Sequence, residues 1–363
     1  MKIQSIRFGM LNVPLKTPFK TAMRTVSEIE DVVVIMETDT GHTGYGSAPA
    51  TAVITGDTHG SIIEAIGKVI SPALMGRDIA DLNNLTNSIQ SSIVRNYSAK
   101  AAVEMAVYDL FGQLYGAPLY KLLGGGDNVI TTDITISVDY IDKMVEDSVA
   151  AIELGFETLK IKVGKDPALD IERIKAIYAA VNERALIRLD ANQGWTPKQT
   201  VSVLRALEES GVRLELVEQP VRGDDIEGMK YVTERIHTPV MADESSFGPK
   251  EAIELIRMRA ADIINIKLMK TGGISNAIKI ADIAGIYGVD CMIGCMLESS
   301  IGVAAAAHIA VAKASVITMV DLDTPALGKY DPVSSGVQFS NAEITITDLP
   351  GLGISKIDNL TML

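Results

Sequence analysis

Short apolar runs recur at regular intervals along residues 126–325. In TLKIK, residues 158–162, Leu159 and Ile161 alternate with two lysines, which is the period of a β-strand. Seven further runs have a similar length: TDITIS, LIRLD, LELVE, PVMAD, DIINIK, VDCMIG and VITMVD. The eight runs end 24 to 28 residues apart, at Ser137, Lys162, Asp190, Glu218, Asp243, Lys267, Cys295 and Asp321. This even spacing indicates a repeated unit of one strand and one connection.

Amphipathic helical patterns fill most of the connections between these runs. PALDIERIKAIYAAVNE (167–183) and TPKQTVSVLRALEES (196–210) both place apolar residues three and four positions apart. Eight strands that alternate with helices predict an α/β fold in which parallel strands close a TIM-type (β/α) barrel.

The first 125 residues lack this regular rhythm. Residues 31–49 predict two strands that are joined by a polar turn around Asp39 to Gly41. Residues 98–118 have helical spacing, with Ser98 as the expected N-cap and Gly116 and Pro118 at the end. The sequence GGGD at 124–127 is a plausible boundary. We predict a domain at 1–125, a barrel at 126–325, and a C-terminal return at 326–363 that packs on the first domain and carries the strand-like run AEITIT.

Composition and charge exclude several classes of function. The chain of 363 residues has a formal charge of −13, so it would repel nucleic acids and anionic membranes. Cys291 and Cys295 lie too close in sequence for a disulfide framework, and we interpret them as reduced thiols. The N-terminus lacks the apolar run of a signal peptide, and no stretch is long enough for a membrane helix. We therefore expect a cytoplasmic protein.

Charged residues gather at the C-terminal ends of the predicted barrel strands. Six of the eight strands end in lysine or an acid, and these ends converge on the mouth of a barrel, where such enzymes place their active sites. A single acidic end could simply cap the following helix. The same position on six strands is harder to explain by capping, and we interpret it as a catalytic mouth.

Three of these ends, Asp190, Glu218 and Asp243, predict a metal site. They follow consecutive strands, and three carboxylates without histidine or cysteine suit a hard divalent cation with positions left open for substrate. We expect one Mg²⁺ per subunit, and Mn²⁺ would fit the same ligands. The alternative is three acids that are each paired with a barrel lysine.

Two lysines, Lys162 and Lys267, end strands on either side of this acidic trio. A second ammonium nearby and a divalent cation both lower the pKa of a lysine, which is the role we expect for Lys160, together with binding of an anionic intermediate. A base on each side of one carbon lets either hand of a stereocentre lose its proton. The pattern therefore favours racemisation or epimerisation next to a carboxylate, through a metal-stabilised enediolate.

Several motifs resemble the enolase superfamily, and within it the muconate-lactonising subgroup. They are KIK (160–162), DAN (190–192), VEQP (217–220), ADES (242–245) and NIKLMKTGG (265–273). The resemblance covers nearly the whole chain. It implies a modified (β/α)7β barrel, an N-terminal α+β capping domain and a homo-oligomer, and it implies that Lys162 and Lys267 are the catalytic bases.

The motif DLD at 321–323 resembles the Asp-x-Asp motif of dipeptide epimerases. There the pair binds the free ammonium of a dipeptide, which implies that role for Asp321 and Asp323. By the same resemblance Arg24 would contact the side-chain carboxylate of the substrate, as in Ala-Glu epimerases. Thr135, Lys160, Cys295 and Leu297 would also line the substrate pocket. The implied activity is Mg²⁺-dependent L-Ala-D/L-Glu epimerisation in cell-wall peptide recycling.

Two features separate this chain from other members of the superfamily. Ser47, in GYGSAP, stands where many relatives are expected to carry an acid, which leaves the details of that loop open. His42, His59, His237 and His308 do not end barrel strands. A histidine base is therefore not expected, unlike in the mandelate-racemase branch.

Other activities remain open on the sequence alone. The same fold could serve a muconate cycloisomerase, an o-succinylbenzoate synthase, an N-acylamino acid racemase or an epimerase of other dipeptides. The substrates of the first three have no free ammonium, and Asp321 and Asp323 argue against them. A Schiff-base aldolase would use a strand-end lysine and the KTGGIS loop for a phosphate, but it has no need of the acidic trio.

Overall fold

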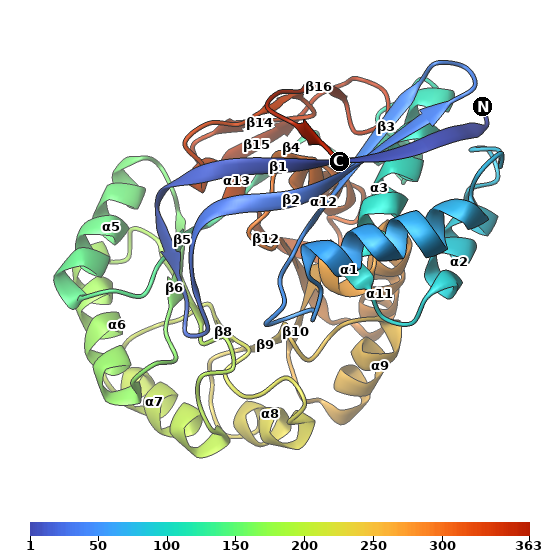
Figure 1. Ribbon diagram of the computed structural model, residues 1–363. Coiled ribbons are helices and arrows are strands. Elements are labelled where there is room, and N and C mark those ends of the chain that lie inside the picture. The colour runs from blue at the N-terminus through green and yellow to red at the C-terminus, as the bar shows by residue number, and fades with distance from the viewer.

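The computed structural model describes residues 1–363. Its N-terminal part is an antiparallel sheet of β1 (Ile3–Lys20), β2 (Thr25–Thr38) and β3 (Thr43–Pro49), which confirms the pair of strands predicted for residues 31–49. β1 and β2 form a long hairpin whose tip reaches over the centre of the barrel (Figure 1). This hairpin connects the N-terminal part to the barrel mouth.

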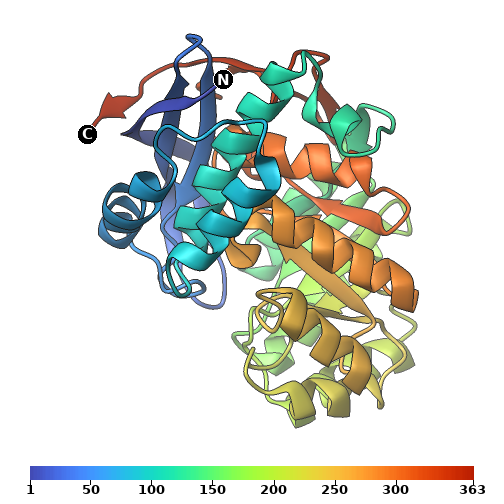
Figure 2. The same ribbon diagram turned by 90° about the vertical axis from the view of Figure 1, so that its right-hand side faces the viewer.

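Helices cover one face of this sheet (Figure 2). They are α1 (His59–Glu64), a π-helical segment at 65–70, a 3-10 turn at 71–73, α2 (Leu82–Ser92), α3 (Tyr97–Leu114) and α4 (Leu119–Leu122). α3 packs closely on β3 because the strand carries glycine at the contact: a Cβ added at Gly46 would lie 1.9 Å from Ala102 O.

The start of α3 corrects one prediction. Its N-cap is Asn96, and Ser98 lies inside the helix. The backbone N–H of Ser98 donates to Asp57 Oδ2 at 3.1 Å, so an acid from a distant loop takes the place of the local cap that was expected from Ser98.

The barrel consists of eight parallel strands surrounded by helices (Figure 1). The strands are β5 (Ile134–Ile136), β6 (Thr158–Lys162), β7 (Leu186–Asp190), β8 (Leu216–Glu218), β9 (Val240–Ala242), β10 (Ile263–Lys267), β11 (Asp290–Gly294) and β12 (Ile317–Asp321). The connecting helices are α5 (Ile141–Glu153), α6 (Pro167–Val181), α7 (Pro197–Glu209), α8 (Ile226–Thr233), α9 (Pro249–Met258), α10 (Leu268–Thr271), α11 (Ile274–Tyr287) and α12 (Ser300–Ala312). The predicted fold class is confirmed.

The strand ladder runs from β5 through consecutive neighbours to β12 and stops there. β5 and β12 share no ladder pairing, so the barrel has one seam, which is defined here as the contact between these two strands. Two single hydrogen bonds connect the residues before β5 to β12. Asp133 N donates to Val320 O on β12, and Leu322 N, just after β12, donates to Thr132 Oγ1.

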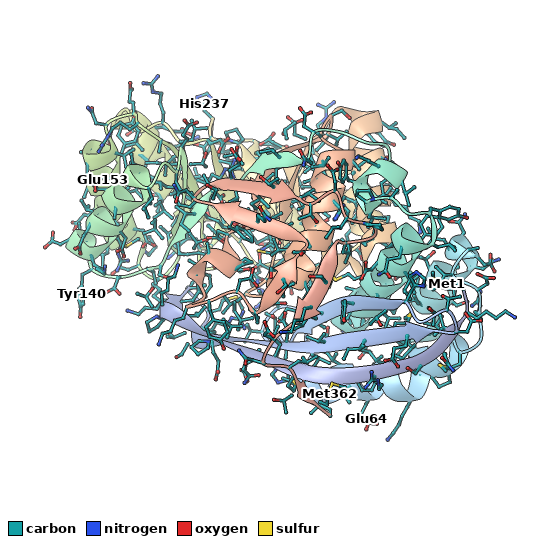
Figure 3. The ribbon with its side chains drawn as sticks, turned by 90° about the horizontal axis from the view of Figure 1, so that it is seen from above. Met1, Glu64, Tyr140, Glu153, His237 and Met362 are labelled. Carbon is teal, nitrogen blue, oxygen red and sulfur yellow. The ribbon has the colours of Figure 1, made fainter.

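The last residues return to the N-terminal part. They form α13 (Thr324–Leu327), β13 (Val333–Ser335), β14 (Val337–Ser340), β15 (Glu343–Ile346), β16 (Ile354–Ile357) and β17 (Thr361–Met362), and β15 pairs with β4 (Val129–Thr131). β17 pairs with β1, with Met362 opposite Gly9 (Figure 3). The exact domain bounds at 125 and 325 stay a prediction.

Two large hydrophobic cores stabilise this arrangement. One joins the N-terminal sheet and its helices to the β10–β12 side of the barrel, and the other fills the space between β5–β9 and their helices. The first core therefore fixes the N-terminal part against the strands that end at Lys267 and Asp321. No helix combines the length and the apolar character needed to cross a membrane.

Candidate active site

A cavity lies at the C-terminal ends of the barrel strands, under the β1–β2 hairpin. All nine residues that the sequence predicted for substrate binding and proton transfer line it: Arg24, Thr135, Lys160, Lys162, Lys267, Cys295, Leu297, Asp321 and Asp323. The predicted metal ligands lie deeper, in contact with the lysines. One cavity thus gathers residues from both ends of the chain.

The two lysines of β6 point into the barrel. Leu159 and Ile161 alternate with them and belong to the outer core against the helices, as the strand period requires. Lys160 and Lys162 both contact Asp190 Oδ2, at 3.1 Å and 2.6 Å from their Nζ atoms. One carboxylate oxygen of the neighbouring strand therefore lies between two ammonium groups.

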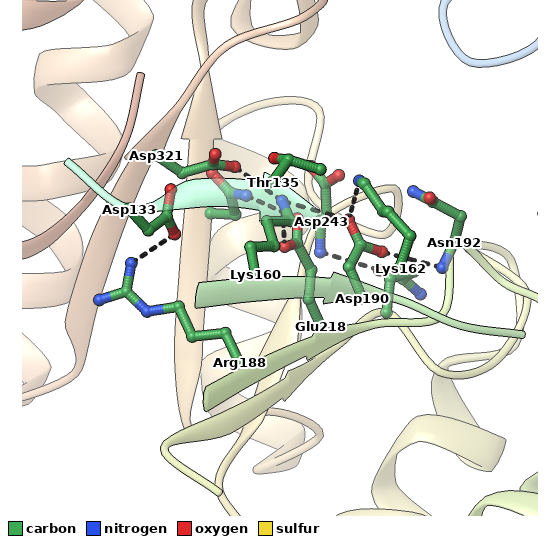
Figure 4. Close-up of polar contacts among 12 residues, drawn as sticks. Asp133, Thr135, Lys160, Lys162, Arg188, Asp190, Asn192, Glu218, Asp243 and Asp321 are labelled. Carbon is green, nitrogen blue, oxygen red and sulfur yellow. Dashed lines mark hydrogen bonds and ion pairs between the residues drawn. The ribbon is translucent and has the colours of Figure 1, made fainter. Parts of the chain in front are cut away.

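The three predicted metal ligands lie on adjoining strands (Figure 4). Asp190 and Glu218 are register partners on β7 and β8, and Asp243 directly follows β9. All three are almost completely buried. Lys267 Nζ contacts Asp243 Oδ2 at 2.8 Å and Glu218 Oε1 at 3.7 Å.

These contacts shift the pKa values of the carboxyl groups in opposite directions. Burial raises the pKa of Asp190 and Asp243, but the adjacent lysines outweigh it and hold both well below the ordinary value. Burial and the neighbouring Asp190 raise the pKa of Glu218 to about 7. The adjacent lysines therefore balance the negative charge of Asp190 and Asp243 but do not fully balance that of Glu218.

The predicted lowering of the pKa of a lysine base depends on a bound divalent cation, and the protein groups alone act in the opposite direction on Lys160 and Lys267. Burial lowers the pKa of both, but the acids around them outweigh it, and both values lie above the ordinary one. Asp321 and Glu218 both lie 2.6 Å from Lys160 Nζ, and Asp243 lies 2.8 Å from Lys267 Nζ. Without a divalent cation these acids stabilise the ammonium forms.

The donor set fits Mg²⁺. No three acidic, histidine or cysteine side chains lie close enough together to hold an ion, because ammonium groups stand between the carboxylates. The ammonium groups show that positive charge is stabilised between these three buried carboxylates. Carboxylate oxygens are ligands that suit Mg²⁺. Glu218 is also fixed from the side, since Asn265 Nδ2 donates to its Oε1 at 2.8 Å.

The predicted ammonium site lies at the seam. Asp321 Oδ2 contacts Lys160 Nζ at 2.6 Å, and the backbone N–H of Thr135 donates to Asp323 Oδ2 at 2.7 Å. Burial and Asp321 raise the pKa of Asp323 to about 6. Two acids at the edge of one cavity provide a site of negative charge for a cationic group of a substrate.

Arg24 and Leu297 line the same cavity from opposite parts of the chain. Arg24 lies in the turn between β1 and β2, where its N–H donates to Thr21 Oγ1, and burial lowers the pKa of its guanidinium. No acid of the chain lies within salt-bridge distance of Arg24, so its guanidinium has no anionic partner of its own. Cys295 is buried, and its Sγ contacts Thr324 Oγ1 at 3.4 Å.

The sequence did not indicate several functional neighbours. Phe19 places its ring 5.7 Å from Lys162 Nζ, and Val53 and Ile54 line the cavity from a second loop. Lys270 contacts Asp243 although it lies beyond the strand end. Lys270 lies within the motif NIKLMKTGG, and Phe19 lies five residues before the predicted Arg24, so both were near a signal. No signal in the sequence indicated Val53 and Ile54.

None of the four histidines lines the cavity. His42 and His237 are exposed, and His237 lies at the outer edge of the barrel (Figure 3). His308 is buried in α12 and accepts a hydrogen bond from Tyr120 N. The prediction that no histidine serves as the base agrees with these positions.

Two family profiles match this chain. The profile of the mandelate racemase/muconate lactonizing enzyme N-terminal domain matches residues 5–124, and the enolase C-terminal domain-like profile matches residues 143–358.

Characterised relatives match over almost the full length. The L-Ala-D/L-Glu epimerase of Clostridium acetobutylicum is 52% identical over 359 residues, which covers 99% of this chain and 100% of that protein. A substrate-liganded structure of the L-Ala-D/L-Glu epimerase from Bacillus subtilis has a TM-score of 0.97 at 48% identity, covering 98% and 99% of the two chains. A dipeptide epimerase from Enterococcus faecalis, complexed with Mg and L-Leu-L-Tyr, has a TM-score of 0.94 at 42% identity, covering 98% and 100%.

Proposed function

Because this chain belongs to the mandelate racemase/muconate lactonizing enzyme family of the enolase superfamily, we propose that it epimerises L-Ala-D/L-Glu at the α-carbon of the C-terminal residue. It is a Mg²⁺-dependent dipeptide epimerase and therefore an isomerase. The observation that carries the proposal is the position of Lys162 and Lys267 on strands that flank the acidic trio, at the wall of one cavity.

Proton transfer is assigned to these two lysines. One removes the α-proton from its side of the substrate, and the other returns a proton from the opposite side, which inverts the centre. Asp190 and Asp243 hold the two ammonium groups, at 2.6 Å and 2.8 Å, and so fix the direction from which each proton moves. Phe19 covers the Lys162 side of the cavity.

Asp190, Glu218 and Asp243 would hold the Mg²⁺. When bound, the ion supplies a Lewis acid for the carboxylate of the substrate and stabilises negative charge as the α-proton leaves. Asn265 and Asn192 orient two of the ligands: Asn265 donates to Glu218, and the N–H of Asn192 donates to Asp190 Oδ1 at 2.9 Å. Mn²⁺ would meet the same oxygen ligands.

The two ends of the dipeptide are assigned to different walls of the cavity. Asp321 and Asp323 would bind the free ammonium, with Thr135, Lys160, Cys295 and Leu297 around the substrate. Arg24, which has no anionic partner in the chain, would bind the γ-carboxylate of glutamate. The relative from Enterococcus faecalis is a hydrophobic dipeptide epimerase. In this chain the guanidinium of Arg24 at the cavity supports an acidic second residue.

We propose cell-wall peptide recycling in the cytoplasm as the biological setting. The two buried cysteines are free thiols, which agrees with a reducing compartment. A homo-oligomer stays a prediction.

The experiment is proton NMR of L-Ala-L-Glu in D₂O with protein and Mg²⁺, with and without EDTA. The expected result is loss of the glutamate α-proton signal with appearance of L-Ala-D-Glu, and suppression of both by EDTA. Exchange with L-Ala-L-Leu but not with L-Ala-L-Glu would contradict the assigned substrate. Absence of exchange with any dipeptide would contradict the epimerase function.

A further inference from the structure

The barrel seam lies directly beneath the proposed ammonium site. β5 and β12 are the two ends of the strand ladder and share no ladder pairing. Thr135 belongs to β5, Asp321 ends β12, and Asp323 follows two residues later. The width of the seam therefore sets how far the Thr135 N–H lies from the two acids.

Arg188, which forms a buried ion pair with Asp133, contacts both sides of this seam (Figure 4). Arg188 projects inward from β7, where it is the register partner of Lys160. Its Nη1 donates to Asp133 Oδ2 at 2.7 Å, beside β5, and to Val320 O at 3.1 Å, on β12. One guanidinium nitrogen thus contacts both sides of the seam, from a third strand.

The pair of Arg188 and Asp133, called here the seam pair, is almost completely inaccessible to solvent. The exposed fractions of the two side chains are 7% and 0%. Burial lowers the pKa of Arg188, but Asp133 and Glu215 outweigh it, so the guanidinium stays charged. Burial and Asp321 raise the pKa of Asp133 well above its ordinary value, and the guanidinium of Arg188 acts in the opposite direction.

The remaining contacts across the seam are few. Asp133 N donates to Val320 O at 3.4 Å, Leu322 N donates to Thr132 Oγ1 at 2.8 Å, and Thr135 N donates to Asp323 Oδ2 at 2.7 Å. A ladder would hold two strands by a series of backbone hydrogen bonds. Between β5 and β12 the contacts of the seam pair take the place of these ladder hydrogen bonds.

We propose that Arg188 is a positioning residue, which fixes β5 against β12 through Asp133 and Val320 and thereby sets the geometry of the ammonium site at Asp321 and Asp323. This inference rests on the proposed function. It assigns to the seam pair a role in recognition of the free amino group of the substrate, without contact between Arg188 and the substrate.

The test compares two substrates on one variant. L-Ala-L-Glu carries the free ammonium, and N-acetyl-L-Ala-L-Glu does not. For Arg188→Met we expect the KM of L-Ala-L-Glu to rise about tenfold or more while kcat changes less than about threefold. The kcat/KM of the acetylated substrate should stay within about twofold of wild type, because its reaction does not use the ammonium site.

Three further variants make the result specific. Glu215→Gln removes the other acid on Arg188 and leaves both seam contacts, so its KM should equal that of wild type. Arg188→Lys retains the charge and should recover part of the lost affinity. Arg188→Met alone leaves the buried Asp133 unpaired. The double variant Asp133→Leu/Arg188→Met replaces both members of the ion pair by apolar groups and should therefore fold. Circular dichroism confirms the fold of each variant.

The outcomes separate the two proposals. If the wild type is active and Arg188→Met has an unchanged KM for L-Ala-L-Glu, the positioning role alone is overturned. If Arg188→Met does not fold, the double variant replaces it in this comparison. An equal loss for both substrates also overturns the positioning role, since that pattern indicates general damage. A wild type that does not act on L-Ala-L-Glu overturns the proposed function, and this inference with it.

Discussion

Lys270 Nζ donates to the backbone carbonyl of Asp243 at 2.5 Å and lies 2.5 Å from Oδ1 of the same residue. The second contact is an ion pair without hydrogen-bond geometry, since Asp243 Oδ1 has no hydrogen-bond partner. Lys270 also donates to Asn265 O at 3.0 Å. Its side chain is 0% exposed, so a single buried cation connects the last predicted metal ligand to the strand that carries Lys267.

Lys270→Met should destabilise the protein. Two buried carbonyl groups would each lose one hydrogen bond, although Asp243 O still accepts from Ser246 N. A buried ion pair would also be broken, which costs roughly 3 to 5 kcal/mol. Thermal unfolding should show a clearly lower Tm. Lys279→Met is the matched control, because Lys279 is exposed on α11 and should leave Tm nearly unchanged. Equal Tm values for both variants would contradict the structural role of Lys270.

Lys162→Ala and Lys267→Ala should each abolish epimerisation, because inversion needs a base on both sides of the α-carbon. Each variant should exchange the α-proton of only one epimer, L-Ala-L-Glu or L-Ala-D-Glu, or of neither. The epimer that still exchanges should differ between the two variants. The loss of epimerisation should be about 10³-fold or more. Proton NMR in D₂O with each pure epimer measures this, and Lys356→Ala, on the exposed surface, is the control. Full epimerisation by either active-site variant would contradict the two-base assignment.

The strand ends were predictable because two independent signals coincide there. The period of two identifies β6, β7 and β8, and a charged residue marks the end of each one: Lys162, Asp190 and Glu218 are the last residues of these strands, as predicted. A charge at the end of an apolar run is a local feature that one sequence can display.

The features that the sequence did not indicate depend on contacts between distant segments. Arg188 was visible within LIRLD, but its partners Asp133 and Val320 lie 55 and 132 residues away, and nothing near Arg188 indicates them. The acceptor for the Ser98 N–H at the start of α3 is Asp57, 41 residues before it, which explains why a local capping rule failed. Phe19 joined the site because a hairpin folds over the barrel, which no periodicity encodes.

Arg24→Met should weaken binding of the acidic side chain. Arg24 lines the cavity and has no acidic partner in the chain, so a substrate γ-carboxylate would be its first ion pair. We expect the KM for L-Ala-L-Glu to rise by about 10- to 100-fold, as for loss of a charge-assisted hydrogen bond. L-Ala-L-Gln has the same shape without the charge, and its KM should change far less. A similar rise for both dipeptides would show that Arg24 does not select the charge.

Gly302→Ala should destabilise the contact between the N-terminal part and α12. A Cβ at this position would lie 1.9 Å from Glu298 Oε2 and 3.4 Å from Ser47 Oγ. Glu298 is buried and cannot move aside freely, so overpacking should cost roughly 1 to 3 kcal/mol. The same contact explains why a serine stands at position 47. An acid there would place a third carboxyl group beside the buried acids Asp31 and Glu298.

Gly60→Ala is the matched control for this substitution. Gly60 lies in α1, and a Cβ added there would have no other atom within 4 Å, so alanine should raise stability by about 0.5 to 1 kcal/mol. Urea unfolding measures both changes. A neutral Gly302→Ala would mean that Glu298 can relax away from α12.

His308 should make stability depend on pH. Its Nδ1 accepts a hydrogen bond from Tyr120 N at 2.9 Å, and burial lowers the pKa of the imidazole to about 3. The unfolded chain has an ordinary histidine pKa near 6.5 and binds the proton more readily than the folded one. The stability contributed by neutral His308 is therefore complete above about pH 6.5 and is lost as the pH falls towards 3.

Replacement of His308 should remove this pH dependence. Between pH 6.5 and 5 the wild type should lose about 1.6 kcal/mol of unfolding free energy through this residue, as the slope rises towards about 1.4 kcal/mol per pH unit. His308→Gln will be less stable at every pH, but its stability should fall by that much less over the same range. Urea unfolding at each pH gives the difference in slope, and His237→Gln, at an exposed site, should keep the wild-type slope. Parallel curves for wild type and His308→Gln would mean that His308 does not exclude the proton in the folded state.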